Sequence, residues 1–215
     1  MRGRSHRTWL KERRRDQFYR RAKKEGFRSR SAFKLQEIAQ KRRFLKPSAK
    51  VVDLGAAPGG WLQVIHEFIG EKGMIVGVDI APIKPLRYKN LTFILTNVEN
   101  PSLPDLINRI TLEKVDAVLS DIAPNISGVW ELDHARQISY AKRAVQIATS
   151  ILKEGGVFFV KLFQGPDLRH YYVTLKRNFD KVSYEKPKAS RPSSSEVYIL
   201  ALGFKSTPKE GLSTH

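Results

Sequence analysis

The sequence contains no cysteine among its 215 residues. This absence excludes disulfide bonds, zinc sites built on thiolates and catalysis by a cysteine nucleophile. No stretch approaches the roughly 20 consecutive apolar residues that a membrane-spanning helix needs. No apolar signal segment follows the N-terminal Met1-Arg2-Gly3-Arg4 either. We therefore expect a cytoplasmic protein that has no contact with a membrane.

Acidic side chains are also in the minority. The chain has 21 Asp and Glu against 39 Lys and Arg, which gives a net charge of +18. This charge favours a polyanionic partner, because each phosphate that a cationic side chain neutralises releases condensed counterions. The excess is concentrated near the N-terminus, where residues 1–30 hold thirteen Lys and Arg and only three acids.

Aromatic residues are interspersed with the N-terminal charges: Trp9, Phe18, Tyr19 and Phe27. Aromatic rings can pack on a domain or stack on bases. We interpret residues 1–28 as a basic arm that contacts RNA. A solvated helix face or a flexible tail would give the same composition, so the arm is a hypothesis about the partner and not about the reaction.

Short apolar runs alternate with helical patterns through the middle of the chain. The runs are rich in Val and Ile and fit strands buried on both faces of a mostly parallel sheet: residues 51–54, 74–78, 91–95, 117–119 and 157–162. The spacing predicts helices over residues 61–69, 104–110, 134–152 and 167–178, and an earlier helix capped by Ser31 that ends near Phe44-Leu45. The third of these helices is expected to stop at Gly155-Gly156.

Two strand-like segments close the domain, residues 181–185 and 197–202, with no helix between them. Strands joined in this way predict an antiparallel hairpin at the edge of the sheet. The basic segment 186–195 that joins them is expected to be mobile. We predict an α/β, Rossmann-like domain over residues 29–205, with a seven-stranded sheet, and a disordered tail over residues 206–215.

The first expected strand runs directly into the turn Gly55-Ala56-Ala57-Pro58-Gly59-Gly60-Trp61, which then opens a helix. In an open α/β sheet this turn is where ligands bind, because glycines allow a close approach of the backbone. Its spacing differs from the Gly-x-Gly-x-x-Gly pattern of dinucleotide sites. We interpret the turn as a site for S-adenosylmethionine, against the alternative of an ordinary tight turn.

A carboxylate, Asp79, ends the second expected strand, where it could accept hydrogen bonds from the ribose hydroxyls of a nucleoside. A nicotinamide dinucleotide would use the same carboxylate, so Asp79 does not discriminate between the two ligands. Trp61 could equally be a core residue or a wall of the ligand pocket.

The fourth expected strand ends at Asp121, beside the glycine-rich turn, and no aromatic residue stands directly after it. Methylation of a base carbon through a thiol adduct is excluded, which leaves oxygen or an exposed ring nitrogen as the acceptor. Lys161 lies inside the apolar strand Val160-Lys161-Leu162-Phe163, where a lysine needs a partner or a function. Methylation of a ribose 2′-hydroxyl would give Lys161 a function as a base, although a lysine at a strand end can also snorkel to solvent.

From about Gly26 to Phe204 the sequence resembles the FtsJ/RrmJ family of ribose 2′-O-methyltransferases. The resemblance rests on four positions of the family's Lys-Asp-Lys-Glu tetrad: Lys34 in Ala32-Phe33-Lys34-Leu35, Asp121 in Ser120-Asp121-Ile122-Ala123-Pro124, Lys161, and Glu196 in Ser195-Glu196-Val197-Tyr198. It implies that Lys161 accepts the hydroxyl proton and that Asp121 orients that hydroxyl near the donor methyl. It further implies that Lys34 and Glu196 position the ribose.

The same resemblance implies S-adenosylmethionine as the cofactor, and no metal. Its donor contacts would be Gly55, Gly59 and Trp61 on the turn, Asp79 at the ribose, and Asp121 near the methionine end. Relatives commonly place an aspartate where this chain has Asn97, which would meet the adenine amino group. The amide oxygen of Asn97 can also accept that hydrogen bond, but it carries less negative charge than a carboxylate oxygen.

We therefore expect an RNA methyltransferase that modifies a ribose 2′-hydroxyl, with a uridine of large-subunit ribosomal RNA as the first choice of substrate and tRNA as the second. No obligate protein partner is evident. A non-catalytic RNA-binding or ribosome-assembly protein with the same fold is the alternative from another class, but all four tetrad positions are filled. A nicotinamide-dependent dehydrogenase is disfavoured by the spacing of the turn.

Overall fold

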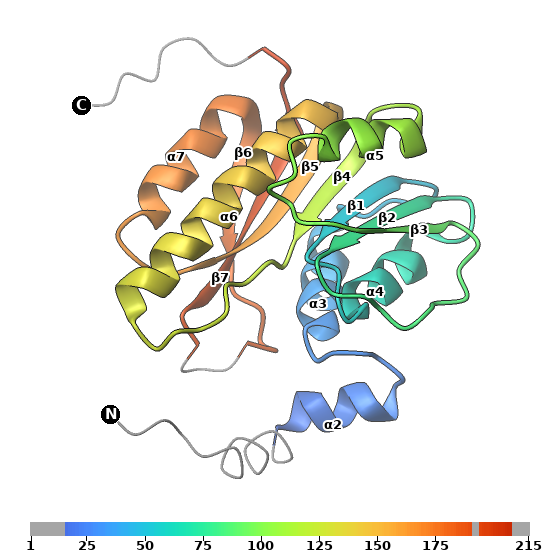
Figure 1. Cartoon of the computed structure of the whole chain (residues 1–215), viewed down its shortest axis with the longest axis horizontal. Coiled ribbons are helices and arrows are strands. Elements are labelled where there is room, and N and C mark those ends of the chain that lie inside the picture. The colour runs from blue at the N-terminus through green and yellow to red at the C-terminus, as the bar shows by residue number, and fades with distance from the viewer. Residues whose placement is uncertain (1–15, 191–193, 208–215) are drawn as a thin grey trace.

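A computed structural model describes residues 16–190 and 194–207 of the chain. Its centre is one seven-stranded sheet with the strand order β3-β2-β1-β4-β5-β7-β6 (Figure 1). The strands are β1 (Lys50–Leu54), β2 (Met74–Asp79), β3 (Leu91–Leu95), β4 (Val115–Ser120), β5 (Leu152–Phe163), β6 (Phe179–Glu185) and β7 (Glu196–Phe204). Strands β1 to β5 pair in parallel, whereas β7 is antiparallel to both β5 and β6. The predicted α/β fold and its antiparallel edge hairpin are confirmed.

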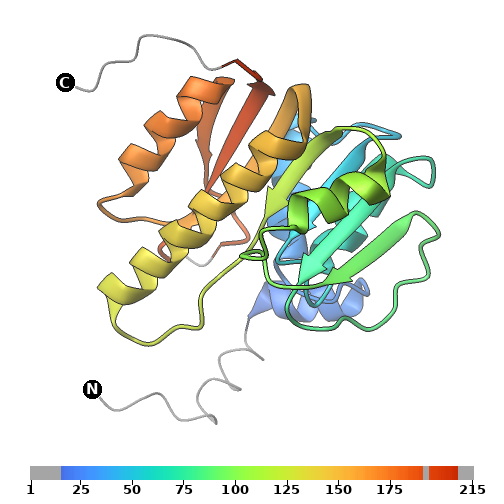
Figure 2. The ribbon, with the colours of Figure 1, turned by 45° about the horizontal axis from the view of Figure 1, so that its top comes forward.

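Helices cover both faces of the sheet. They are α2 (Gln17–Lys24), α3 (Ala32–Arg42), α4 (Gly60–Ile69), α5 (Leu103–Thr111), α6 (Trp130–Ile151) and α7 (Leu168–Asn178). Helices α3 and α4 lie on one face, and α5, α6 and α7 lie on the other, as Figures 1 and 2 show from two directions. The central strands are apolar on both faces because each face is covered in this way.

Successive residues of β5 belong to the two different cores. Phe158 and Val160 pack in the cluster that includes α6 and α7, whereas Phe159 packs with α3 and α4. Because side chains alternate along a strand, Lys161 points to the same side as Phe159, the side of α3. The alternation therefore turns Lys161 toward the helix that carries Lys34.

Ser31 stands at the N-cap position of α3 as predicted, but the capping hydrogen bond and the end of the helix differ from the prediction. Ser31 precedes α3, but its hydroxyl hydrogen-bonds the Ser29 hydroxyl at 2.8 Å and caps no backbone group of the helix. The helix then ends at Arg42, because Arg43 adopts the left-handed conformation with φ of 52°. The end therefore comes before Phe44-Leu45, where it was expected.

The glycine stop predicted for α6 is also wrong. The helix ends at Ile151, because the buried Leu152 already has extended backbone and pairs with Val115 as the first residue of β5. Gly155 and Gly156 lie inside β5, where the register shifts between Val115 and Ala117. These glycines form an irregularity of a strand and not the end of a helix.

The segment between β6 and β7 is packed over its first half, in contrast to the mobile linker expected. Ala189 and Ser190 are buried. The backbone N–H of Lys188 donates to the Glu37 carboxylate at 2.8 Å, and Arg30 donates to the carbonyl of Ala189. The segment therefore approaches the site along α3, and residues 191–193 lie outside the described part.

The basic arm is described only from residue 16 onward, and residues 1–15, which include Trp9, lie outside the described residues. Asp16 caps α2 by accepting from the N–H groups of Phe18 and Tyr19. Ala22 is buried against Phe33 of α3, so α2 rests on the domain. No helix in the described part of the chain is both long and apolar enough to cross a membrane. Most of the predicted tail, residues 208–215, is likewise outside the description.

Candidate active site

A cavity of about 290 Å³ opens at the carboxyl ends of β1, β2 and β4. It is lined by Gly55, Ala57, Asp79, Ile80, Thr96, Asn97, Val98, Asp121, Ile122, Ala123 and Tyr140. Four of the predicted donor residues are in this lining: Gly55, Asp79, Asn97 and Asp121. Ligands of open α/β sheets bind at this edge, so the cavity is in the expected place for a nucleoside donor.

Gly55 is where the turn after β1 meets the loop after β4. Its φ is +83°, and a Cβ atom there would stand 2.8 Å from Cγ1 of Ile122. A side chain at residue 55 would therefore push apart the two segments that form the cavity. Both the positive φ and the lack of room beside Ile122 therefore require glycine at residue 55.

Asp79 connects the glycine-rich turn to the end of β2. Its Oδ2 accepts from the N–H of Ala57 at 2.9 Å, and its Oδ1 accepts from the N–H of Ala81 at 2.8 Å. A carboxylate has about four lone-pair positions, so both oxygens can accept further hydrogen bonds from the cavity side. Asp79 can thus shape the turn and bind the two hydroxyls of a ribose.

Gly59 and Trp61, also predicted to contact the donor, lie outside the cavity lining. Gly59 precedes α4 with φ of +105°. Trp61 is buried: its Nε1 donates to the carbonyl of Ser31 at 3.0 Å, and its ring stacks on Phe159 at 5.6 Å between centroids. In this structure the side chain of Trp61 is a core group that links α4 to the segment before α3.

Asn97 lines the cavity, but its Oδ1 already accepts from the N–H of Glu99 at 3.0 Å. An amide oxygen has two lone pairs, so one remains for an adenine amino group. The prediction missed other lining residues. Ile80 and Thr96 directly follow two strand ends, a signal that could have found them, whereas Tyr140 lies on α6 with no distinguishing sequence feature.

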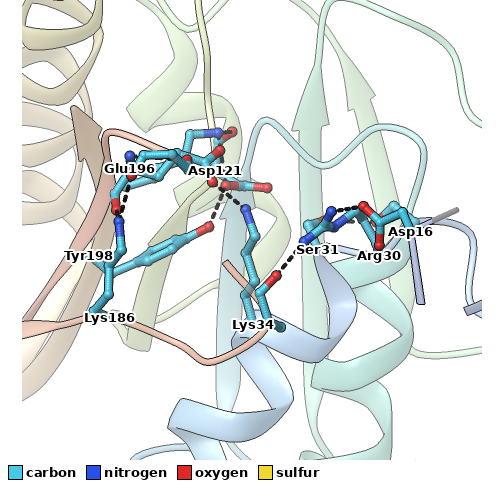
Figure 3. A network of polar contacts seen from close by, with 12 residues as sticks. Asp16, Arg30, Ser31, Lys34, Asp121, Lys186, Glu196 and Tyr198 are labelled. Atoms are coloured by element: carbon cyan, nitrogen blue, oxygen red, sulfur yellow. Dashed lines mark hydrogen bonds and ion pairs between the residues drawn. The ribbon is translucent and has the colours of Figure 1, made fainter. Parts of the chain in front are cut away.

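The four tetrad positions come together as two ion pairs, and Figure 3 shows Lys34, Asp121 and Glu196 of this group. Nζ of Lys161 lies 2.9 Å from Oδ1 of Asp121 and also donates to the Asp121 backbone oxygen at 2.6 Å. Nζ of Lys34 lies 2.5 Å from Oε2 of Glu196. Both lysines are buried, at 7% exposure for Lys34 and 5% for Lys161. Residues from α3, β5, β7 and the end of β4 thus form one charged cluster.

Tyr198 joins the two ion pairs. Its hydroxyl donates to Oδ1 of Asp121 at 3.3 Å, and its ring centroid lies 5.9 Å from Nζ of Lys34. In the β5–β7 ladder, Lys161 is opposite Tyr198 and Phe163 is opposite Glu196. The antiparallel pairing therefore brings Glu196 to the carboxyl end of β5, although the two residues are far apart in the sequence.

Burial and charge set the ionisation of two groups in this cluster. Burial raises the pKa of Glu196, but the ammonium groups of Lys34 and Lys161 and the hydrogen bond from Lys34 outweigh it, so the net pKa lies below its usual value. The pKa of Tyr198 is raised well above its usual value by burial and by the charge of Asp121. At neutral pH, Glu196 is therefore an anion and Tyr198 a neutral donor.

Asp53 of β1 is fully buried, and the sequence predicted no role for it. Neither of its carboxylate oxygens has a hydrogen-bond partner among the described residues. Burial raises its pKa well above the usual value, and the charges of Asp121 and Asp79 raise it further. Within residues 16–190 and 194–207, no group of three or more His, Asp or Glu side chains is arranged to hold a metal ion.

Comparisons with known proteins agree with this geometry. The sequence profile of the FtsJ-like methyltransferases matches residues 27–204. The chain is 44% identical over 205 residues to the ribosomal RNA large subunit methyltransferase E of Methanocaldococcus jannaschii, covering 93% of this chain and 82% of that protein. It is 43% identical over 198 residues to the protein of the same name from Coxiella burnetii, covering 90% and 92%.

The fold is also found in a crystal structure of a Plasmodium falciparum protein named as a ribosomal RNA methyltransferase. The two structures superpose with a TM-score of 0.73 at 28% sequence identity, covering 83% of this chain and 98% of the other. The profile match spans most of the chain and includes every residue of the two ion pairs. The chain belongs to the FtsJ-like methyltransferase family.

Proposed function

We propose that this protein transfers the methyl group of S-adenosylmethionine to a ribose 2′-hydroxyl of large-subunit ribosomal RNA. The observation that carries the proposal is the position of Asp121, which lines the donor cavity and is also ion-paired to Lys161 of the tetrad. One side chain thus joins the expected donor site to the expected acceptor site.

The residues of the cavity suit this donor. Asp79 can accept hydrogen bonds from the two ribose hydroxyls, and Ile80 and Val98 supply apolar walls for an adenine ring. Gly55 keeps the turn close to Ile122. When bound, S-adenosylmethionine supplies a methyl carbon made electrophilic by its sulfonium. The protein must then hold the acceptor oxygen in line with that carbon.

The tetrad can hold and deprotonate the acceptor. As the 2′-oxygen bonds to the methyl carbon and the sulfonium–methyl bond breaks, the hydroxyl loses its proton. Nζ of Lys161 is the acceptor we assign to that proton, and the ammonium that is ion-paired to Asp121 must first give up one of its own protons to act as this base. Asp121 orients the hydroxyl next to the cavity, and the Lys34–Glu196 pair, 2.5 Å apart, provides a donor and an acceptor for the ribose.

Ribosomal RNA of the large subunit is the substrate named for the relatives at 43% and 44% identity. The net charge of +18 suits a polyanion of this kind. A non-catalytic RNA-binding role would not require the two buried lysine–carboxylate pairs, because burying charges is costly even when they are paired. The intact pairs therefore favour an enzyme.

The proposal is tested with donor that carries a radiolabelled methyl group. Large ribosomal subunits, free ribosomal RNA and tRNA are incubated separately with the protein, and the labelled RNA is digested to nucleosides. We expect label in a 2′-O-methylnucleoside from the large-subunit RNA. Label on a base, label in tRNA alone, or no label in any RNA would contradict the proposal.

A further inference from the structure

An apolar surface follows Asp121 along the chain, at the junction of the loop after β4 with the start of α6. Four large apolar side chains are exposed there: Ile126 at 67%, Val129 at 54%, Trp130 at 43% and Leu132 at 42%. Contiguous exposed apolar groups on a soluble protein commonly mark a binding surface. None of the four belongs to the cavity lining or to the tetrad.

Trp130 is held in place although it is partly exposed. Its ring stacks on His134 at 5.8 Å and 25° and on Phe163 at 6.1 Å and 28°. The loop before it is fixed by Asp133, which accepts from the N–H and hydroxyl of Ser127 and from the N–H of Gly128. The ring is therefore a preorganised surface, and a ligand that stacks on it need not order it first.

The ring also lies close to the reacting groups. Phe163, on which it stacks, follows Lys161 by two residues on β5 and is opposite Glu196 in the ladder. Two residues of extended strand span about 6–7 Å. From this spacing we expect the Trp130 ring to be within reach of a base attached to the ribose held by the tetrad, or of the base of the adjoining nucleotide.

Two carboxylates near the ring favour contact with bases over contact with the RNA backbone, although the cation Arg136 lies close to Asp133 on the same helix. Glu131 is exposed next to Trp130, and the carboxylate of Asp167 lies 3.3 Å from Nε2 of His134, with 58% of its side chain exposed. Carboxylates repel phosphates, whereas the face of a base is uncharged. Recognition of unpaired RNA commonly uses bases stacked on aromatic side chains in this way.

We propose that Trp130 is a stacking platform for an unpaired nucleobase of the RNA substrate, either the base of the methylated nucleotide or that of its neighbour. The inference rests on the proposed function, because it takes RNA as the substrate. It adds a binding residue that Asp121, Lys161 and their partners do not provide. The target ribose is then positioned from two sides, by the tetrad and by a base held on Trp130.

The first test compares Trp130→Ala and Trp130→Phe with a matched aromatic control. Tyr184 is 45% exposed and stacks on Tyr172 at 4.6 Å, but it lies on the edge strand β6, separated from β5 by β7. We expect Trp130→Ala to lower the affinity for large-subunit ribosomal RNA by roughly 5- to 100-fold, the range that stacking on one base provides. Trp130→Phe should retain most of the affinity, and Tyr184→Ala all of it.

Donor affinity, measured by calorimetry, separates a substrate role from damage to the fold, and it should be equal in all variants. Equal RNA affinity in wild type and Trp130→Ala, with methyl transfer intact in both, would overturn this inference and leave the proposed function standing. Equal RNA affinity in the two proteins is also the result expected if the apolar surface binds a protein instead of RNA. Absence of methyl transfer by the wild type to any RNA would instead overturn the proposed function itself.

The second test detects the stacking directly through tryptophan fluorescence. In a Trp9→Phe background, the remaining tryptophans are Trp130 and the buried Trp61. A short single-stranded RNA should quench the emission, whereas an abasic ribose-phosphate oligomer of the same length should not. The quenching should disappear in the Trp130→Phe variant. Equal quenching by the abasic oligomer, or quenching that persists without Trp130, would overturn the proposal.

Discussion

At the scale of single residues, the site depends on charges that are buried in pairs. Lys34 and Lys161 each meet one carboxylate, and Tyr198 bridges the pairs. Removing one partner of such a pair leaves the other buried without compensation, which costs more than the pair itself contributes. Each member therefore controls the ionisation of its neighbours as well as its own contacts.

Replacing Lys34 should raise the pKa of Glu196. Burial alone pushes that pKa upward, and the charge and hydrogen bond of Lys34 are the largest opposing effects. In Lys34→Met we expect Glu196 to titrate at higher pH than in the wild type, together with a shift of the acidic limb of the activity profile to higher pH. Carbon NMR of the labelled glutamate carboxyl measures this, and an unchanged titration would contradict the assigned pairing.

Asp53→Asn should stabilise the protein at neutral pH. Burial, with Asp121 and Asp79, raises the pKa of Asp53 in the folded state. Between the unfolded pKa of about 3.9 and this raised value, the folded state binds more protons, so the stability of the wild type falls as pH rises. The asparagine variant has no such loss. Its free energy of unfolding in urea should exceed that of the wild type at about pH 8, and the excess should shrink below about pH 4.

One result would contradict the predicted stabilisation of the protein by Asp53→Asn. If the variant is less stable than the wild type at pH 8 and equal to it at pH 4, the carboxylate has a stabilising partner that the structure does not show. Thr111→Val, which removes a buried hydroxyl that donates to the carbonyl oxygens of Ile107 and Glu113, serves as a control for urea sensitivity at a buried polar position. That variant should be destabilised equally at both pH values.

Site residues were predictable from the sequence where their position has one dominant chemical explanation. Lys161 stands out as a charge within an apolar strand, and Asp79 and Asp121 stand out at strand ends. Trp61 was not decidable, because a tryptophan beside a ligand turn and a tryptophan in the core look alike in sequence; its packing on Phe159 depends on where β5 lies. The donor and catalytic roles of all the predicted site residues stay predictions, including those of Gly55, Asp79 and Asp121 in the cavity lining.

At the scale of elements, the position of α3 decides where Lys34 lies. Glu185 at the end of β6 is buried, and Arg42 at the end of α3 donates to it from Nε at 2.6 Å, with a further ion pair from Lys41 at 3.3 Å. The last turn of α3 is therefore fixed to the edge of the sheet. The first turn of the same helix carries the tetrad lysine.

Arg42→Ala should destabilise the protein by about 1–3 kcal/mol, because it removes the closer partner of a buried carboxylate. Lys41→Ala is the matched control: the side chain is 59% exposed and its nitrogen is farther from Glu185, so its loss should cost less than about 1 kcal/mol. Urea unfolding of both variants measures the difference. Equal effects of the two substitutions would show that Arg42 does not hold the helix.

Strand interiors were predictable because Val and Ile runs fit a sheet covered on both faces, and the predicted runs 51–54 and 74–78 lie within β1 and β2. The start of α6 and the cause of its C-terminal end were not predictable, because both depend on tertiary contacts. The helix begins at Trp130, which stacks on Phe163, and it ends at Ile151, where Leu152 pairs with Val115. Neither contact leaves a local sequence signal.

At the scale of the whole molecule, the densest positive charge lies before the candidate site in the chain. Residues 1–15 carry seven Lys and Arg and one acid, outside the described part, whereas the cavity and tetrad lie within residues 34–196. We propose that the N-terminal arm supplies affinity for RNA and that residues 29–205 supply the chemistry. Because α2 packs on α3 through Ala22 and Phe33, a deletion that tests the arm should stop before residue 16.

Deleting residues 1–15 should weaken RNA binding and flatten its salt dependence. The slope should change by about 0.7 for each phosphate of single-stranded RNA that the shortened protein no longer neutralises. Donor affinity should be unchanged. Deleting residues 208–215, which hold one Lys and one Glu, is the control and should leave the slope as it is. Titrations of RNA binding at several salt concentrations measure both. A slope that is the same with and without residues 1–15 would contradict the role of the arm.

The central claim is that Lys161 takes the proton of a ribose hydroxyl beside the donor cavity, and one comparison tests it most directly. Lys153 lies on the same strand as Lys161 and is also ion-paired to an aspartate, Asp116 of β4, but it is 53% exposed and at the opposite end of β5. Methyl transfer to large-subunit RNA is measured for Lys161→Ala and Lys153→Ala, with donor affinity measured by calorimetry. We predict that Lys161→Ala binds donor but forms no 2′-O-methylnucleoside, while Lys153→Ala forms it at the wild-type rate. Wild-type turnover by Lys161→Ala would contradict the account.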